Sequence, residues 1–465
     1  VMGDVHKRLG LFDRALDLLG QSSALDARVA APRSAELART RFLIGEVHLF
    51  EERFDEAEAA LREALQAQRS MPDPPVAEIA DTLNLLGRLE NLRKRFDVAE
   101  PLLDEALDLR RDLFGEDSLP VAHSLQSLGL LRQGQRRADD ALALFRRALD
   151  IRRRHLGPRH PRTAELLQNV ASALQRTGQV EEALSTMAEA LDATIASYGE
   201  EHQGVGWTLS GMAYSLQQLG RLDEAIAHDE RAVEILRRRG GGPSGVGALV
   251  QLSRHLTQAG QLRRAEAAAR EALEWLGDSP DDPDPKRSNV LVDLGTILTL
   301  DGRYAEAGVA LEETLRLDIA TYGEDHPYVA QDRYKLGELA RLSGEPLEAL
   351  VWLDAALERQ RRLRPGSNAL GLSLIARGET LRELRRYGDA EASFRAALEV
   401  FAVETPADHP DVWTATLGLG AALADGGQVD EGRALMEEAA RGLEAKLGAE
   451  SSRVQEAWGR LAARL

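Results

Sequence analysis

Residues 157–162 read GPRHPR and have the composition of a small anion-binding loop. Two arginines and a histidine supply cationic or hydrogen-bonding side chains, while proline restricts the backbone and glycine allows it to turn. The segment recurs along the chain with an acidic residue in place of Arg159. The recurrences are GEDSLP (115–120), GEEHQG (199–204) and GEDHPY (323–328). A repeated anion site would keep its positive charge, so GPRHPR is predicted to join two helices, with Pro161 in the first turn of the second.

Two other segments resemble ligand-binding loops only in composition. RRRGGGPSGVG (237–247) lacks the Lys-Ser/Thr pair of a phosphate-binding loop and follows no predicted strand. DSPDDPDPK (278–286) is acidic but lacks the central glycine and final glutamate of a calcium-binding EF-hand. Both are predicted to be loops between helices.

The chain contains no recognisable catalytic motif. Its ten histidines form no HExxH or other close ligand set. His160, His326 and His409 each precede a proline at a related position, which indicates that these residues mark the starts of helices. GxSxG, HRD and DFG are absent, and neighbouring carboxylates such as Glu181 and Glu182 fall at solvent-facing positions. We therefore expect no enzyme, no metal and no cofactor.

Composition narrows the class of protein further. The chain has 465 residues, no cysteine and a formal net charge of −18. Disulfides, thiolate zinc sites and a cysteine nucleophile are excluded. The acidic balance argues against nucleic-acid binding, which needs clustered positive charge. No apolar run reaches the ~18 residues that span a bilayer, and the N-terminus lacks the apolar stretch of a signal peptide. We expect a cytoplasmic protein.

A pattern of an apolar residue, two polar residues and alanine recurs throughout the chain. Its alanine anchors are residues 15, 57, 99, 141, 183, 225, 265, 307, 349 and 390, with Gly432 in the eleventh place. Successive anchors lie 42 residues apart except for one gap of 40 and one of 41. Such a period indicates a repeat architecture of eleven units rather than several separate domains.

Each repeat has the features of a helical hairpin. A small residue, such as Gly45, Gly87 or Gly129, lies twelve residues before each anchor. A bulky apolar residue usually lies three before the anchor, and glycine lies five before it in seven repeats. The small residue predicts close contact between two helices, because glycine inside a helix otherwise costs about 1 kcal/mol. The later glycine predicts the end of the first helix.

These spacings resemble the tetratricopeptide repeat, and the 42-residue period resembles the longer repeats of kinesin light chains. The segments GLFDRALDLL and HLGPRHPRTAELLQNVASAL are also similar to the repeat regions of large bacterial serine/threonine kinase proteins. The resemblance implies an all-α, right-handed solenoid that fills residues 1–465 as one domain. The first repeat is expected to be truncated, with its first helix beginning before Val1, and residues 453–465 are expected to form a terminal or capping helix with Ala462 in the small-residue place.

The resemblance also implies that the first helix of each hairpin lines a concave binding face. Candidate side chains lie about one turn either side of each small residue. They are Asn84, Arg88, Asn91, Gln126, Gln133, Gln168, Asn169, Ser172, Gln175, Trp207, Tyr214 and Gln217, followed by the more charged Tyr334, Lys335, Glu338, Arg341, Glu379 and Arg382. Carboxamides both donate and accept hydrogen bonds, so this row suits the backbone of an extended peptide. The alternative is an ordinary solvated helix surface in which Trp207 is simply packed.

We therefore predict a scaffold that binds a protein or peptide partner on its concave face. A regulatory segment of a larger signalling enzyme, such as a serine/threonine kinase, remains an alternative. RNA binding by a related helical repeat is disfavoured by the net charge of −18.

Overall fold

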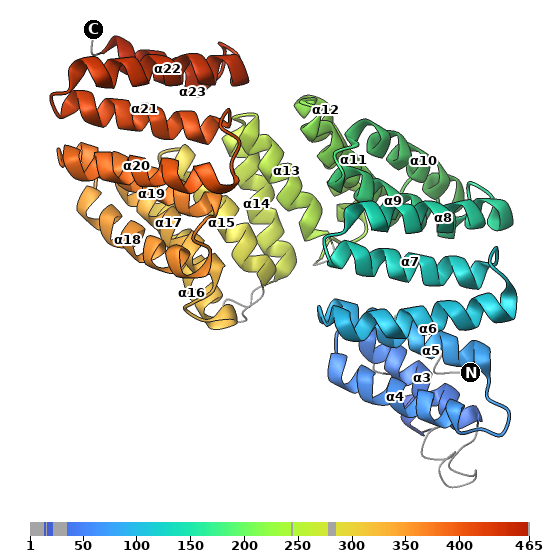
Figure 1. Ribbon diagram of the computed structural model, residues 1–465. Helices are drawn as coiled ribbons and strands as arrows, with labels where there is room; N and C mark the ends of the chain where they lie inside the picture. The colour runs from blue at the N-terminus through green and yellow to red at the C-terminus, as the bar shows by residue number, and fades with distance from the viewer. Residues whose placement is uncertain (1–13, 15, 22–34, 243–244, 278–284, 464–465) are drawn as a thin grey trace. The chain divides into compact units, whose positions relative to one another are not determined.

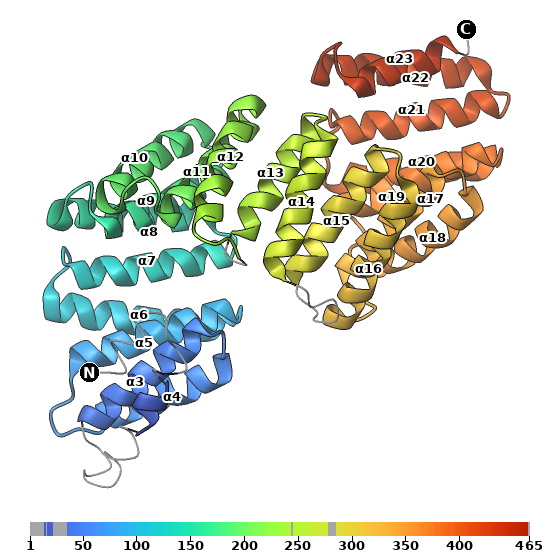
Figure 2. The ribbon, with the colours of Figure 1, turned by 180° about the vertical axis from the view of Figure 1, so that it is seen from behind.

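The computed structural model describes residues 14, 16–21, 35–242, 245–277 and 285–463, and within these residues it contains helices and no strand. The helices alternate between the first helix (A) and the second helix (B) of successive hairpins (Figures 1 and 2). The A helices are α3 (Ala35–Phe50), α5 (Val76–Leu92), α7 (Leu119–Gly134), α9 (Pro161–Arg176), α11 (Gln203–Gln218), α13 (Val246–Gln258), α15 (Pro285–Leu300), α17 (Pro327–Leu342), α19 (Asn368–Glu383) and α21 (Pro410–Asp425). The B helices are α4 (Phe54–Arg69), α6 (Phe96–Phe114), α8 (Ala138–Leu156), α10 (Val180–Tyr198), α12 (Leu222–Arg238), α14 (Leu262–Leu276), α16 (Tyr304–Tyr322), α18 (Pro346–Leu363), α20 (Tyr387–Glu404) and α22 (Val429–Leu447).

The chain divides into two compact units, residues 1–239 and 240–465. The division falls at the Gly-rich segment where the sequence period shortens to 40. Gly240, Gly241 and Gly242 all have positive φ angles there, which side chains other than glycine rarely adopt. Each unit is a stack of hairpins, so the all-α repeat array is confirmed. The single uninterrupted solenoid stays a prediction.

The small residue of each A helix allows close contact with its own B helix. A Cβ atom on Gly87 would lie 2.6 Å from Cγ of Leu103 and 3.2 Å from the carbonyl oxygen of the anchor Ala99. On Gly129 it would lie 2.4 Å from the ring of Phe145. Leu103, Phe145 and the anchor alanine are completely buried. The predicted helix contact is confirmed for these hairpins, whereas α9, α11 and α13 carry Ala171, Ala213 and Ser253 at the same place instead of glycine.

The turn inside each hairpin contains a residue with a positive φ angle, even in repeats whose sequence has no glycine there. Every repeat with a described turn has a left-handed residue five positions before its anchor, whether or not that residue is glycine. The non-glycine cases are Glu52, Lys94, Arg136 and Arg385, with φ between 57° and 62°. The B helix then begins at the bulky apolar residue, as α4 does at Phe54 and α6 at Phe96.

The end of the chain carries one further helix, α23 (Ser452–Ala462). Its Val454, Ala457 and Leu461 pack in a buried cluster with residues of α21 and α22. The predicted terminal helix is therefore confirmed, and Ala462 is exposed near its end. Expectations about residues 1–13 and about most of the acidic loop, 278–284, concern positions outside those described.

Candidate functional site

A pocket of about 500 Å³ lies along the A helices of the N-terminal unit. Its wall includes Asn84 and Arg88 of α5, Gln126 of α7 and residues of α3 and α9. In each A helix the lining positions are mainly six and three residues before the small residue and one after it. We call the side chains at these positions the A-face. The predicted row of candidate residues belongs largely to this face, as the repeat phase requires.

The amides of the row are not equivalent. Nε2 of Gln133 donates to Ser172 Oγ at 2.9 Å, and Nε2 of Gln168 donates to Thr208 Oγ1 at 2.7 Å. Nε2 of Gln175 donates to Ser215 Oγ at 2.8 Å. Each of these bonds joins one A helix to the next. The glutamine amides therefore tie successive repeats together, a role that residue type alone does not reveal.

Other members of the row keep hydrogen-bonding capacity. Asn84 is 1% exposed, and its Oδ1 atom has no hydrogen-bond partner in the described part of the chain. The Oδ1 atom of Asn91 likewise has no hydrogen-bond partner among the described residues. Asn169 and Gln217 are half-buried on α9 and α11, and Gln217 already takes part in an interaction of its own. Because a buried carbonyl oxygen without a partner is costly, Asn84 is the amide whose environment best fits a bound donor.

The two aromatic candidates are exposed on α11. Trp207 is 45% exposed and Tyr214 is 44% exposed. They lie six residues before and one after the small residue Ala213, the same positions that line the pocket on α5 and α7. The alternative that Trp207 is packed inside the repeat does not fit its exposure. Large aromatic side chains on such a face are typical anchors for a partner.

The sequence analysis missed the basic floor of the pocket. Arg110 and Arg152 come from B helices α6 and α8, and Arg162 and His123 from A helices; all line the pocket. Burial, together with the positive charges of Arg110, Arg88, Arg152 and Arg162, lowers the pKa of His123 to about 3. The imidazole is therefore neutral. A usable signal existed, because Arg110 and Arg152 lie one period apart in the chain.

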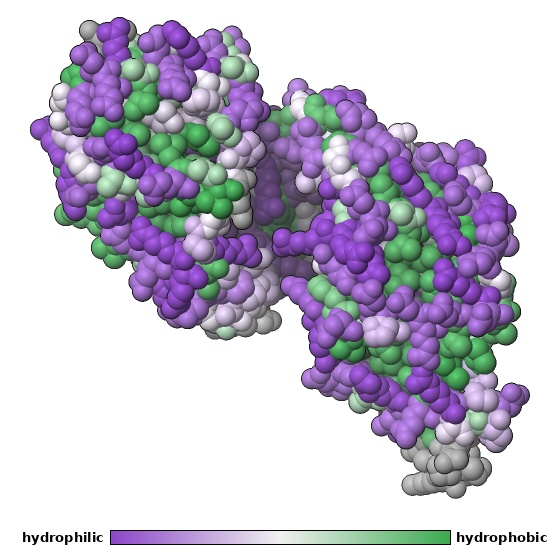
Figure 3. All heavy atoms as spheres, in the orientation of Figure 1, coloured by the Kyte–Doolittle hydropathy of each residue, from purple (hydrophilic) through white to green (hydrophobic). Residues whose placement is uncertain are grey.

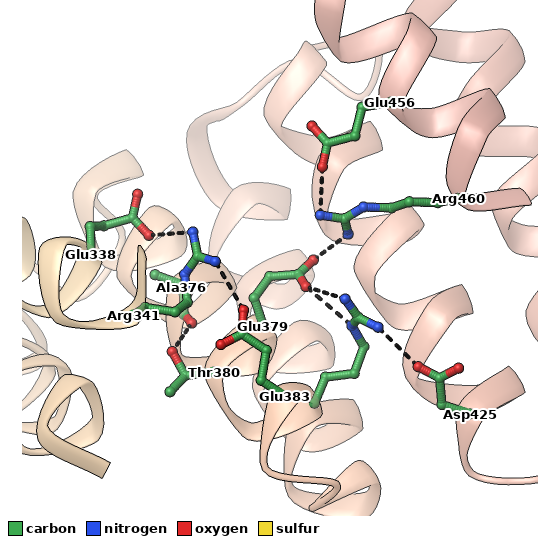
Figure 4. Close-up of polar contacts among 10 residues, drawn as sticks. Glu338, Arg341, Ala376, Glu379, Thr380, Glu383, Asp425, Glu456 and Arg460 are labelled. Atoms are coloured by element: carbon green, nitrogen blue, oxygen red, sulfur yellow. Dashed lines mark hydrogen bonds and ion pairs between the residues drawn. The ribbon is translucent and has the colours of Figure 1, made fainter. Parts of the chain in front are cut away.

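The candidates of the C-terminal unit are engaged in an ion-pair network (Figure 4). Arg341 contacts Glu383 at 3.0 Å and Glu338 at 3.5 Å. Glu379 contacts Arg460 of α23 at 2.6 Å and Arg382 at 3.1 Å.

The remaining candidates of this unit lie on α17. The Tyr334 hydroxyl donates to Glu338 at 3.4 Å, and burial raises the pKa of Tyr334. Lys335 is half-buried, and its positive charge favours the ionised form of Asp293. The network and these contacts neutralise much of the charge that the sequence places on this face.

GPRHPR joins α8 to α9, as predicted. Gly157 ends α8 with φ 86° and ψ 163°, a backbone region that is essentially restricted to glycine. His160 precedes α9 and its ring accepts from the backbone N–H of Arg162 at 3.1 Å. His326 and His409 cap their helices in the same way. Arg159 contacts Asp192 of α10 at 3.0 Å, so it links neighbouring repeats.

The described residues offer neither a metal site nor a membrane-spanning helix. Within the described residues no group of three or more His, Asp or Glu side chains is placed to hold a metal ion. Among the helices of the same residues, none combines the length and apolar character needed to cross a membrane. Hydrophilic residues cover most of the viewed surface, with apolar residues showing in short stretches (Figure 3).

Comparison with protein families agrees with the geometry. A tetratricopeptide repeat profile matches residues 1–70, 78–154, 128–196, 162–238, 205–276, 286–362 and 333–402. A second profile of the same description matches residues 42–113 and 375–445. The chain belongs to the tetratricopeptide repeat family. No curated protein matches this tetratricopeptide repeat chain significantly.

Several solved structures share the fold at low identity. The apo form of the quorum sensor NprR from B. thuringiensis is 13% identical, with TM-score 0.55, over 78% of this chain and 98% of that one. Aspartyl phosphate phosphatase F from Bacillus subtilis is 16% identical, with TM-score 0.52, over 80% and 95%. A putative kinesin light chain from Podosopora anserina, with TPR-like repeats, is 21% identical, with TM-score 0.38, over 43% and 95%. The likeness to the first two structures shows the fold alone.

Proposed function

We propose that this tetratricopeptide repeat chain is a scaffold that binds a protein or peptide partner along the A-face of its N-terminal unit. The observation that carries the proposal is the pocket along α3, α5, α7 and α9, which is lined by polar side chains from successive repeats. A solenoid presents a long surface built from many repeats rather than one enclosed active site. Such a surface suits an extended ligand.

The side chains along this face support the proposal. Asn84 offers an acceptor without a partner in the described part of the molecule, and a peptide backbone supplies N–H donors at regular intervals. Trp207 and Tyr214 offer exposed aromatic surface three repeats further along, on α11. The glutamines that cross-link neighbouring A helices hold these groups in fixed positions, so little conformational entropy would be lost on binding.

Affinity capture tests the proposal. The full chain, immobilised, is exposed to extract of the source cells, and captured proteins are compared with those held by the double variant Trp207→Ala, Tyr214→Ala. We expect the variant to lose about tenfold or more of the captured partner, since aromatic anchors commonly contribute about 2 kcal/mol or more. Circular dichroism should show unchanged helicity, because both side chains are exposed.

A matched control separates the A-face from aromatic surface in general. Phe114 is 46% exposed and lies at the end of the B helix α6. The variant Phe114→Ala should capture the partner as well as wild type does. Equal capture by wild type and by the double variant would contradict the proposal.

A further inference from the structure

Arg152 is a buried charge that forms no ion pair with an acidic side chain of the described residues. It is 5% exposed. Its guanidinium donates to the backbone oxygen of Arg162 at 2.5 Å and to Oε1 of Gln126 at 2.6 Å. Both acceptors are neutral. Arg110 occupies the same place one repeat earlier, and it pairs with the carboxylate of Asp81. A buried charge without a counter-ion is costly, so the surroundings of Arg152 favour an added anion.

Two further guanidinium groups line the same pocket. Arg88 and Arg162 are exposed, and neither is among the ion pairs of the described residues. Arginines outnumber carboxylates in the pocket wall, with Arg88, Arg110, Arg152 and Arg162 against Glu46, Asp81 and Glu165. Asp81 is engaged by Arg110, and Glu165 acts only at longer range on Arg152. The pocket is thus locally basic in a chain whose formal net charge is −18.

The neighbouring amide adds a second requirement on the ligand. Asn84 lines the pocket and is almost completely buried, and its Oδ1 atom accepts no hydrogen bond from the described residues. A fully deprotonated inorganic anion such as sulfate has no donor for this oxygen. A peptide has one, because each residue other than proline carries a backbone N–H.

We propose that the pocket formed by Asn84, Arg88, Arg110, His123, Arg152 and Arg162 binds the side-chain carboxylate of an Asp or Glu residue in an extended peptide. This inference rests on the proposed function and specifies the chemistry of its ligand. Guanidinium groups bind carboxylates through two parallel hydrogen bonds, and Asn84 accepts the N–H of the peptide backbone. The acidic protein would then select an acidic segment through one local basic site rather than through its overall charge.

The C-terminal unit offers matched controls. Arg341 and Arg382 lie on A helices, but each already contacts carboxylates of this chain, Glu383 for the first and Asp425 for the second, both at 3.0 Å. Their charges are compensated internally. Removing either charge should therefore leave ligand selection unchanged, while removing Arg88 should not.

Selection from a random peptide library tests the inference. Peptides of about twelve residues, a length that an extended ligand needs to cross several repeats, are displayed with both ends joined to the carrier, so that only side chains bear carboxylates. The full chain is the bait, and we expect binders enriched in Asp and Glu over the input library. A selected peptide and its form with Asp→Asn and Glu→Gln are then titrated by fluorescence anisotropy. The neutral form should bind about tenfold to a hundredfold more weakly, as lost charged hydrogen bonds require.

The bait variants decide where the preference originates. Arg88→Gln removes an exposed charge and should abolish the enrichment, as should Arg152→Gln; Arg382→Gln should retain it. Binders without acidic enrichment, or enrichment that survives Arg88→Gln, would overturn the inference while peptide binding itself stands. A bait that selects no peptide also overturns it, and the affinity capture with Trp207→Ala, Tyr214→Ala then decides the proposed function separately.

Discussion

Single buried polar residues differ in what their surroundings provide. Arg110 forms an ion pair with Asp81, whereas the hydrogen bonds of Arg152 to described residues go to neutral oxygens. Asp332 of α17 is 2% exposed and lies against the carboxyl group of Asp318, which is 5% exposed. Burial and the charge of Asp318 raise the pKa of Asp332 to about 8. Asp332 is therefore protonated at neutral pH and donates a hydrogen bond to its neighbour.

This carboxyl pair predicts a pH-dependent stability. An unfolded aspartate ionises near pH ~4, so between about pH 4 and pH 8 the folded state retains a proton that the unfolded state loses. The free energy of unfolding then falls as pH rises through that window. An asparagine side chain in this place would keep a hydrogen-bond donor and cannot ionise. Asp332→Asn should match wild type near pH ~5 and exceed its free energy of unfolding at pH ~8 by about 1–3 kcal/mol.

Urea unfolding between about pH 5 and pH 8, inside the window set by the two pKa values, measures this difference. Asp301→Asn, which removes an exposed carboxylate, is the control and should give a profile parallel to wild type. If Asp332→Asn also ran parallel to wild type, the protonated carboxyl pair would be disproved.

At the scale of the hairpin, the close contact between the two helices restricts which residue fits at the small-residue place. Gly129 of α7 faces the ring of Phe145, which leaves no space for a methyl group. In Gly129→Ala the gain in helix propensity, about 1 kcal/mol, competes with the cost of forcing apart a packed pair, about 1–3 kcal/mol or more. Since the ring is rigid and fully buried, we expect a net loss of about 1–2 kcal/mol.

Thermal or urea unfolding of the full chain measures the loss. Gly247 of α13 provides the control, because a Cβ atom there meets nothing within 4 Å. Gly247→Ala should be neutral or stabilising. Equal stability of Gly129→Ala and wild type would show that the hairpin repacks freely and that glycine is not required.

The elements at the end of the chain are joined by charge as well as by packing. Arg460 of α23 reaches Glu379 of α19, 81 residues earlier in the sequence. Burial would raise the pKa of Glu379, but the charges of Arg460 and Arg382 outweigh it and hold that pKa below its ordinary value. The carboxylate therefore stays ionised and the terminal helix remains attached to two repeats. This network explains why the charged candidates of this unit are poor candidates for binding a partner.

At the scale of the whole molecule, the period predicted nearly all of the fold. Anchors spaced by 42 residues located the hairpins, because small and bulky residues at fixed distances allow only one way of pairing the helices. The candidate face followed from the same phase. The hydrogen-bond partners of its side chains could not be predicted in this way. Gln168 donates to Thr208, whereas Oδ1 of Asn84 has no partner among the described residues, and the difference comes from their neighbours in space. The basic floor was missed because Arg110 and Arg152 belong to B helices.

Hydrogen exchange of the full chain, with and without the captured partner, measures directly whether the partner binds along the A-face. We expect slower exchange of backbone amides in α5, α7, α9 and α11, with residues 240–465 unchanged. The backbone amides of these helices do not bind the peptide themselves, but a bound peptide should slow local opening of the helices that it contacts. Protection confined to B helices, or to residues 240–465, would contradict binding on the A-face of the N-terminal unit.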